Sequence, residues 1–419
     1  MRNKKLCSYH AENMKHFKDL ACYYKFIDYK KYDIYQKRYR YHQNELKECN
    51  RIMALKIDEN GVENYYRIPS DIRKIINVED LKTNWEIHSM DYKELFRIKP
   101  KDEIPPIDNP IFVDVEEAKQ WLQPDEPVIV LPSSKEEYAK AYPIQVLLWH
   151  EIVNDFILEE PIVVTYAPLC NISYIYKREV KNQIYEFGSS GILRFSCTLM
   201  YDIETESLWE VMTGNCIVGD LTGEKLTAIP SNTVPFKTFY ETNPEGLVIL
   251  SSETGYSFRY GINPYALYDE AKSPFFYKNN IDERYPAMER VVGIKKDSVK
   301  KAYPYSIIKK LRVIEDVIED KELVIFYQED MISPLNKPIV SEGKKVGVTG
   351  VFSPYINGRK INFYSNNNKI FDKETNSEWN LLGYALNGSL QGERLKMLVH
   401  SDPFWFAWSA CYPDTEVYV

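Results

Sequence analysis

Short apolar runs separated by turn residues make up most of the chain. Residues 127–132, 161–166 and 198–201 are rich in Val, Ile, Leu and Tyr, and turn-forming residues follow each run closely. Such runs predict β-strands joined by tight turns. Helical spacing of apolar residues stands out after Pro143, through residues 149–155, and a helix is expected there. The expected fold class is therefore α+β, mainly antiparallel β.

One stretch of the chain occurs twice. Residues 202–209 read D-I-E-T-E-S-L-W and residues 372–379 read D-K-E-T-N-S-E-W, while Lys-Ala-Tyr-Pro occurs at both 140–143 and 301–304. Asp, Thr and Ser bond their own backbone in turns, so the acidic stretch favours a shared hairpin over a pair of catalytic carboxylates. The repeated order of motifs predicts two tandem, internally duplicated domains.

The repeat divides the chain into five expected parts. They are a Tyr- and Lys-rich arm (1–55), short strands with a Pro-rich connector (56–126), copy one (127–250), an aromatic bridge (251–290) and copy two (291–419). The arm has no Pro or Gly from residue 8 onward, and one or two helices fit it best. We therefore expect the two domains to stand behind a helical N-terminal arm.

Charge separates the arm from the body. Residues 1–50 carry 12 basic and 6 acidic side chains, a net charge of +6, which leaves −14 for the rest of a chain whose total is −8. An acidic body is not expected to bind nucleic acid. The arm either packs on the body through its aromatic side chains or docks a protein partner.

The sequence bears on the compartment in two ways. No run approaches the ~18 apolar residues of a membrane helix, so no transmembrane segment is expected. The charged N-terminus is not followed by an apolar segment, so the chain as written is expected to be cytoplasmic, or extracytoplasmic if a signal peptide has been removed. The seven Cys show no C-x-x-C spacing and do not predict a dense disulfide framework.

A histidine and a glutamate resemble the start of a zinc-protease helix. His150 and Glu151 match the first half of H-E-x-x-H, but residue 154 is Asn, so two imidazoles cannot hold a metal from one helix face. Copy two has no His-Glu pair at this place. Either His150 is a helix residue that bonds only to neighbouring polar groups, or it belongs to a functional site that is specific to copy one.

Other residues that could take part in catalysis or metal binding also occur in only one copy. A shared fold does not require them, so we expect them to meet in a cleft between the copies. The predicted catalytic residues are His150, Glu151 and Arg194, the last as an anion-binding group. The predicted ligands of a zinc or copper ion are His150, Cys170, Cys197 and His400. A Cys nucleophile with a His base is the metal-free form of this hypothesis, and an inert buried thiol is the plain interpretation of each Cys.

Several ordered motifs resemble one known family. They are IPPIDN (104–109), AYP (141–143), WHEIVND (149–155), TYAPLC (165–170), LMYD (199–202), MERVVG (288–293) and FWFAW (404–408). Over about residues 103–419 the chain is similar to the domain-of-unknown-function 3179 family. The resemblance implies no established activity, and it implies a secreted or envelope protein.

Two positions depart from the pattern of that family. Members typically have T-Y-C-P-L-C where this chain has Ala167, and R-N-S-D where it has residues 194–197, R-F-S-C. If the family's site uses the Cys pair, the chemistry here is altered or lost, unless Cys197 supplies the missing sulfur. Two functions stay open: a metal- or thiol-dependent site between the copies, and a non-catalytic envelope or assembly protein that presents residues 1–50 to a partner.

Overall fold

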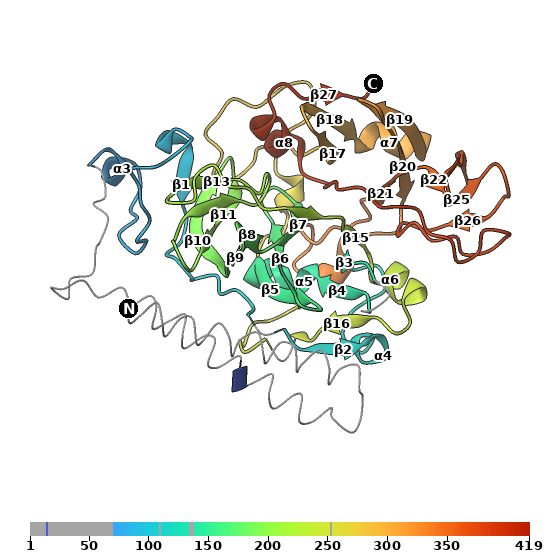
Figure 1. The fold of residues 1–419 in the computed structure, drawn as a ribbon, viewed down its shortest axis with the longest axis horizontal. Coiled ribbons are helices and arrows are strands. Elements are labelled where there is room, and N and C mark those ends of the chain that lie inside the picture. The colour runs from blue at the N-terminus through green and yellow to red at the C-terminus, as the bar shows by residue number, and fades with distance from the viewer. Residues whose placement is uncertain (1–13, 16–69, 109, 134–137, 252–253) are drawn as a thin grey trace.

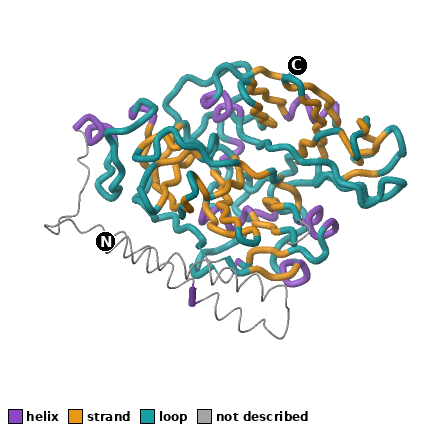
Figure 2. Tube along the Cα trace, in the orientation of Figure 1, coloured by secondary structure: helices purple, strands orange, loops and turns teal. Residues whose placement is uncertain are grey.

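The computed structural model describes residues 14–15, 70–108, 110–133, 138–251 and 254–419. It is β-rich, with mainly antiparallel sheets and a few short helices (Figures 1 and 2). The predicted helical arm lies outside the described residues except for residues 14–15. In the described part of the chain, no helix is long and apolar enough to cross a membrane.

Residues 70–126 form the N-terminal edge of the described body. The elements are α3 (Ser70–Ile75), the 3-10 helix η1 (Tyr92–Glu94), β1 (Leu95–Arg97), β2 (Phe112–Asp114) and α4 (Val115–Ala118). Asp114 caps α4 by accepting a hydrogen bond from the Glu117 amide, which satisfies one of the unpaired groups at the helix start. β1 and β2 each join a larger sheet, so this region belongs to the body.

Three sheets build the first half, which we define as residues 127–250. The first has the order β1, β10 (Phe187–Arg194), β11 (Cys197–Asp202), β12 (Leu208–Glu210) and β13 (Cys216–Val218). The second has the order β14 (Ala228–Ile229), β7 (Ile172–Lys177), β6 (Glu160–Ala167) and β5 (Ile152–Ile157). The third has the order β15 (Asn232–Pro235), β3 (Pro127–Leu131), β4 (Lys140–Pro143), β16 (Leu247–Ile249) and β2, with β16 and β4 parallel.

The first half also contains two seven-residue helices and a small ribbon. The helices are α5 (Ile144–His150) and α6 (Phe236–Thr242), and the ribbon is β8 (Glu179–Val180) with β9 (Gln183–Ile184). A proline stands at the N-cap of each helix, Pro143 for α5 and Pro235 for α6. The fixed φ of proline and its missing N–H suit a position just before or within the first turn.

The predicted helix through residue 155 is wrong in its second part. The helix ends at His150, Glu151 turns the chain with φ +57°, and residues 152–157 form strand β5 against β6. Leu147, Leu148 and Val153 fit a helical period, but a β-branched run bounded by a sharp turn fits a buried strand equally well. The sheet pairing with β6 decides between the two.

Smaller sheets build the second half, residues 291–419. They are β17 (Val291–Lys296), β18 (Val299–Pro304) and β27 (Glu416–Val417); β19 (Val313–Ile318), β20 (Lys321–Gln328) and β21 (Val348–Phe352); and β24 (Phe363–Asn366), β25 (Lys369–Asp372) and β26 (Glu378–Trp379). The remaining elements are the ribbon β22 (Tyr355–Ile356) with β23 (Arg359–Lys360), and the helices α7 (Tyr305–Leu311) and α8 (Trp405–Cys411). β18 and β27 are parallel, and the other strand pairs of this half are antiparallel.

The described part of the bridge, residues 251 and 254–290, is mostly irregular and contains the 3-10 helix η3 (Tyr268–Glu270). A second 3-10 helix, η4 (Val340–Glu342), lies in the long loop after β20 of the second half. The backbones meet where Asn263 N donates to the Pro338 carbonyl and Leu267 N donates to the Asn336 carbonyl, both at 2.8 Å. The bridge and this loop therefore lie against each other.

The repeated acidic stretch is a turn in each half. Trp209 Nε1 donates to Asp202 Oδ2 at 2.9 Å, and Trp379 Nε1 donates to Asp372 Oδ2 at 3.0 Å. Each aspartate also accepts from the hydroxyl of the Thr three residues on, and both tryptophans are buried. The carboxylates are used by the turn itself, as their residue types indicate.

The two halves share their hydrophobic cores. One cluster joins Ile129, Val163 and Ile175 of the first half to Phe404 and Trp408 of the second. Another cluster joins β3 and α6 to β20, β21 and β25. The junction of the halves is therefore largely a packed interior, and open space occurs there only locally.

Candidate functional site

His150, the last residue of α5, is buried with both ring nitrogens bonded. Nδ1 lies 2.8 Å from the Pro105 carbonyl oxygen, which only accepts, so Nδ1 carries the proton. Nε2 accepts from the Tyr260 hydroxyl at 2.6 Å, and the Tyr256 and Phe258 rings pack against the imidazole. Burial lowers the pKa of His150 to about 4, against the effect of the bond to Pro105. The ring is neutral near pH 7, and neither nitrogen is available to a metal in this arrangement.

Glu151 follows with a buried carboxyl group. The side chain is 4% exposed, hydrogen bonds link it to Thr198 and Tyr265, and Oε2 has no hydrogen-bond partner among the described residues. Burial raises the pKa of this carboxyl to about 7. Thr198 directly follows Cys197, so this polar group adjoins the predicted sulfur site.

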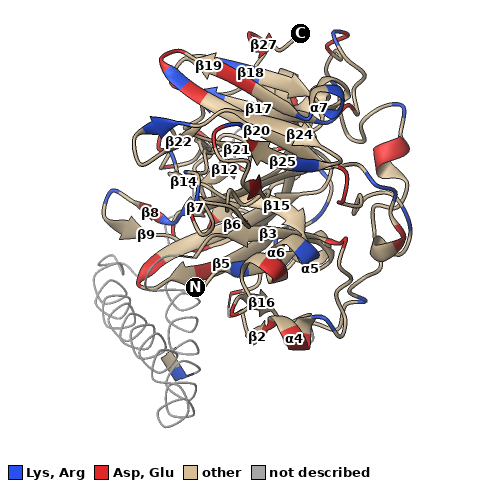
Figure 3. Ribbon diagram, turned by 90° about the vertical axis from the view of Figure 1, so that its right-hand side faces the viewer, with Lys and Arg blue, Asp and Glu red and all other residues tan. Residues whose placement is uncertain are grey.

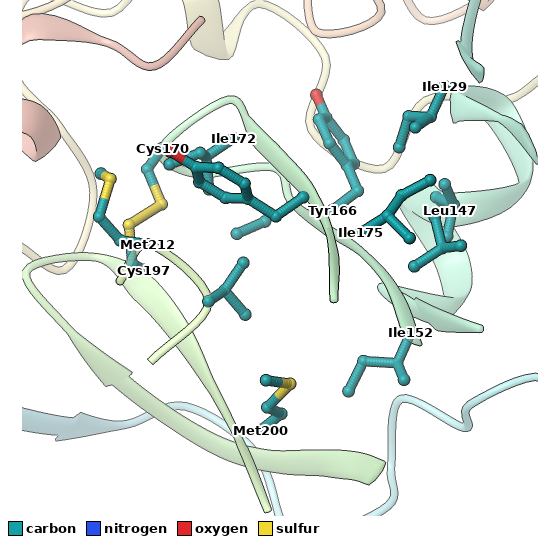
Figure 4. Close-up of a cluster of buried hydrophobic side chains, with 14 of the residues drawn as sticks. Ile129, Leu147, Ile152, Tyr166, Cys170, Ile172, Ile175, Cys197, Met200 and Met212 are labelled. Carbon is teal, nitrogen blue, oxygen red and sulfur yellow. A yellow bond between two sulfur atoms is a disulfide. The ribbon is translucent and has the colours of Figure 1, made fainter. Parts of the chain in front are cut away.

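Cys170 and Cys197 form a disulfide with Cα atoms 5.6 Å apart. Figure 4 shows the S–S bond among Tyr166, Ile172 and Met212, in the interior of the first half. It joins the turn between β6 and β7 to the start of β11, and thus links two sheets. Neither sulfur is a thiolate that could bind a metal or attack a substrate.

The two free cysteines in the described part of the chain do not replace this pair. They are Cys216, which is buried, and Cys411, which is half-buried. Burial raises the pKa of both thiols above the ordinary range. Each is therefore protonated near neutral pH and is a weak nucleophile.

Arg194 and His400 are engaged elsewhere. Arg194 Nε donates to Glu94 Oε2 at 2.7 Å and Nη1 donates to Glu210 Oε1 at 2.5 Å. The guanidinium is therefore already paired with two carboxylates of the protein. His400 donates from Nδ1 to the Leu398 carbonyl at 2.8 Å. Neither side chain bonds to His150 or to the disulfide.

The predicted metal site is therefore not assembled. Within the described ranges, no three His, Cys, Asp or Glu side chains are grouped so that they could hold a metal ion. The physical reasons are that the two sulfurs are bonded to each other and that the His150 nitrogens are occupied. The predicted ligands His150, Cys170, Cys197 and His400 are thus not brought together around one metal position.

A pocket of about 310 Å³ opens where the bridge meets the second half. Its polar walls include Asp269, Glu289, Arg290, Tyr305, Lys309 and Lys344. Next to it lies a small cavity of about 20 Å³, lined by Ile144, Tyr166 and Asn171 of the first half, by Arg290 at the end of the bridge, and by Tyr305 and Asp402 of the second half. Arg290 and Tyr305 line both spaces, and of the two only the small cavity has walls from both halves.

Arg290 is the unusual group of this pocket. It directly precedes β17, is 8% exposed, and donates one side-chain hydrogen bond, from Nη2 to Ser333 Oγ at 3.1 Å. Its guanidinium lies 5.2 Å from the centre of the Phe404 ring. It forms no ion pair with any residue that the structure describes. A buried guanidinium without a counter-charge is costly unless a ligand completes it.

Asp402 of the small cavity is bonded within its own half and across the junction. Asp402 Oδ1 accepts from the Thr349 hydroxyl at 2.7 Å, and the Asp402 carbonyl accepts from Asn171 Nδ2 of the other half, also at 2.7 Å. Burial raises the pKa of Tyr305 well above its ordinary value of 10, with a further contribution from the Asp402 charge. The tyrosine is therefore a neutral hydroxyl that can donate or accept.

Two other surface hollows give less reason to expect a ligand site. One of about 640 Å³ lies between α3 and β1, and one of about 400 Å³ lies beside the β22–β23 ribbon. The charged side chains that line them are exposed or half-buried. Such groups stay solvated, and they give no reason to expect a specific ligand.

Sequence reasoning missed Arg290 and Tyr305. It sought residues present in only one half but considered mainly His and Cys. Under the expected duplication Arg290 meets the same criterion and corresponds to Pro127, since Pro127 pairs with Pro235 as Arg290 pairs with Phe404. Arg290 also lies in one of the motifs that carry the family resemblance. Comparing every charged residue with its counterpart could have found it.

Comparison with known proteins gives a family. Neither a curated protein nor a solved structure matches the chain. A family model described as "protein of unknown function (DUF3179)" matches residues 101–415, well over half of the chain. This protein therefore belongs to the DUF3179 family.

Proposed function

We propose that the protein binds a small molecule in the pocket between the bridge and the second half. The observation that carries this proposal is the pairing of a pocket of about 310 Å³ with a small cavity, both of them lined by Arg290 and Tyr305. A concave space of this size with a few convergent polar groups is typical of small-molecule sites. The small cavity lies between the halves, as expected for the site, and the pocket lies beside it. The proposal replaces the metal and the thiol.

An internal duplication supports this position. α5, β5 and β6 begin at residues 144, 152 and 160, and α7, β19 and β20 begin at residues 305, 313 and 321, a constant offset of 161. α6 and β16 begin at 236 and 247, and α8 and β27 at 405 and 416, a constant offset of 169. We infer that residues 127–250 and 291–419 are copies of one unit, joined by the bridge 251–290.

Backbone details support the same inference. Glu151 and Arg312 both end their helices with a positive φ, 57° and 67°, and both carbonyls accept from a tyrosine amide on the next strand but one, at 2.8 and 2.9 Å. In each unit the last strand runs parallel to the strand before the helix. Two copies that pack about their junction naturally leave a site there, with different residues from each copy.

The disulfide has a structural part in this proposal. It cross-links the turn that holds Cys170 to β11. This turn contacts the second half, because Phe404 N donates to the Cys170 carbonyl at 3.0 Å. Disulfides persist mainly in oxidising compartments, which favours an extracytoplasmic location for the protein. The sulfurs thus hold one wall of the junction, and the proposed site needs no free thiol.

A fragment-binding experiment tests the site. The panel is benzoate, benzamide, benzylamine, inorganic phosphate and glucose, and binding to the full chain is detected by ligand-observed NMR. Ser306→Trp fills the pocket from an exposed position of α7, whereas Ser298→Trp makes the same change in an exposed turn outside it. We expect at least one probe to bind the parent and Ser298→Trp but not Ser306→Trp. Binding of no probe, or equal binding to both variants, contradicts the proposal.

A further inference from the structure

We propose that the ligand of this pocket carries a carboxylate group and that Arg290 binds it. This inference rests on the proposed function, and it adds the chemical class of the ligand. It is drawn from the charges and contacts of the described pocket residues.

One cation of the pocket wall has no acidic partner. Each lysine in its wall has an acidic partner: Lys309 with Glu329 at 3.8 Å, Lys344 with Asp269 at 3.6 Å, and Lys345 with Asp125 at 3.7 Å. Glu289 accepts from the Ser306 amide at 2.8 Å. Among the described residues of the pocket wall, Arg290 alone is a cation without an acidic partner. A single anion bound at Arg290 would pair this cation.

The surroundings favour a carboxylate over a phosphate. Asp269 and Glu289 line the same pocket, and Asp402 lines the small cavity beside it. These acidic groups would repel a dianion more strongly than a monoanion. A carboxylate also matches the planar fork of an arginine with two parallel hydrogen bonds.

The guanidinium is already oriented for such a ligand. Ser333 Oγ holds Nη2, and Phe404 lies against the guanidinium. Nε and Nη1 make no hydrogen bond with the described residues. A side chain that is fixed before binding loses little entropy when the ligand arrives, so these donors can discriminate between a carboxylate and a neutral amide of the same shape.

The test compares benzoate with benzamide on the full chain, by isothermal titration. We expect the parent to bind benzoate on the order of 10- to 100-fold more tightly, as for hydrogen bonds to a charged group. Arg290→Gln should abolish this preference, and Arg290→Lys should reduce it, because lysine keeps the charge but loses the fork. Arg284→Gln is the matched control, since Arg284 also lies over an aromatic ring, Trp405, but is paired with Asp282.

The outcomes separate this inference from the proposed function. Equal binding of benzoate and benzamide, with both lost in Ser306→Trp, would leave the site in place and overturn the carboxylate assignment. Tighter binding of inorganic phosphate than of benzoate would overturn it as well. Binding of no probe to the parent would contradict the site itself. If Arg290→Gln does not fold, Arg290→Lys carries the test, and an unchanged preference there would count against Arg290.

Discussion

Two lysine–tyrosine–aspartate groups, one in each half, have the same bonds in different surroundings. In the first half Lys140 Nζ lies 3.0 Å from Asp155 Oδ2, and the Tyr142 hydroxyl donates to that oxygen at 2.7 Å. The second half repeats these contacts at 2.6 and 2.8 Å with Lys301, Tyr303 and Asp316. The lysine and aspartate side chains are 2% and 0% exposed in the first half but 17% and 19% exposed in the second.

The different burial has a cause in the chain before the first half. The Pro-rich connector lays Ile107 beside β5, where Ile107 N donates to the Ile152 carbonyl at 2.9 Å and Asn154 N donates to the Ile107 carbonyl at 2.8 Å. The equivalent edge, β19, has no such cover in the described structure, and Val317 is 52% exposed where Phe156 is 4% exposed. Figure 3 shows charged residues on β18, β19 and α7, whereas β3 and β15 are uncharged. The same geometry therefore has different energetic consequences in the two halves.

Replacing the aspartate should give the largest difference in stability between the two halves. Asp155→Asn removes the carboxylate that pairs with the buried Lys140 ammonium, and breaking a buried ion pair costs about 3–5 kcal/mol of unfolding free energy. Asp316→Asn exposes its lysine to water and should cost less than about 1 kcal/mol. Denaturant unfolding of both variants measures the two values. Equal costs would show that the connector does not isolate the first group from solvent.

The disulfide gives the second largest difference, because it has no counterpart in the second half. Cys170 and Cys197 close a loop with a sequence separation of 27, and losing such a cross-link costs roughly 3–4 kcal/mol on the chain-entropy account. The double variant Cys170→Ser/Cys197→Ser should therefore unfold at lower denaturant concentration than the parent. Adding a reductant should lower the stability of the parent and leave the double variant unchanged. A reductant effect that persists in the double variant would place the sensitive sulfur elsewhere.

Much of the architecture could be predicted from local patterns. The runs at 127–131 and 161–166 form strands because β-branched residues bounded by turn residues fit a buried sheet. The Asp202 and Asp372 turns follow from side chains that bond their own backbone. These features depend on contacts within a few residues, and a single sequence contains them.

The site depended on contacts that local patterns do not contain. Cys170 lies in the turn between β6 and β7, and Cys197 begins β11 of another sheet, so their pairing follows from how the two sheets pack. Arg290 is distinctive because an acidic partner is missing from its surroundings, which only the folded chain displays. The same holds for Glu151: the end of α5 at His150 and the burial of the next side chain are set by pairing with β6 and by Tyr265 of the bridge.

Glu151 gives the third and smallest difference, and it depends on pH. The first half buries a carboxyl where the second half has Arg312, which is half-buried and paired with Glu329 at 2.7 Å. Burial raises the pKa of Glu151 from 4.5 to about 7, so folding favours its protonated form. Below about pH 4.5 the carboxyl group is protonated in both the folded and the unfolded state and does not lower the unfolding free energy. Between pH 4.5 and 7 the unfolded state loses the proton first, and the unfolding free energy falls until it levels off above pH 7.

Glu151→Gln should remove this part of the pH dependence. At pH 8 the variant should be about 1–3 kcal/mol more stable relative to the parent than it is at pH 4, since one pKa unit corresponds to about 1.4 kcal/mol. Asp108 and Glu126, whose pKa values burial also raises to about 7, leave part of the slope in the variant. Arg312→Gln changes the residue at the other helix end without removing an acid. It also frees Glu329, whose pKa Arg312 lowers, so its slope should change only below about pH 4.5 and should match that of the parent between pH 4.5 and 7. An unchanged slope in Glu151→Gln would mean that the carboxyl is solvated, and the contrast between the two helix ends would then not extend to their energetics.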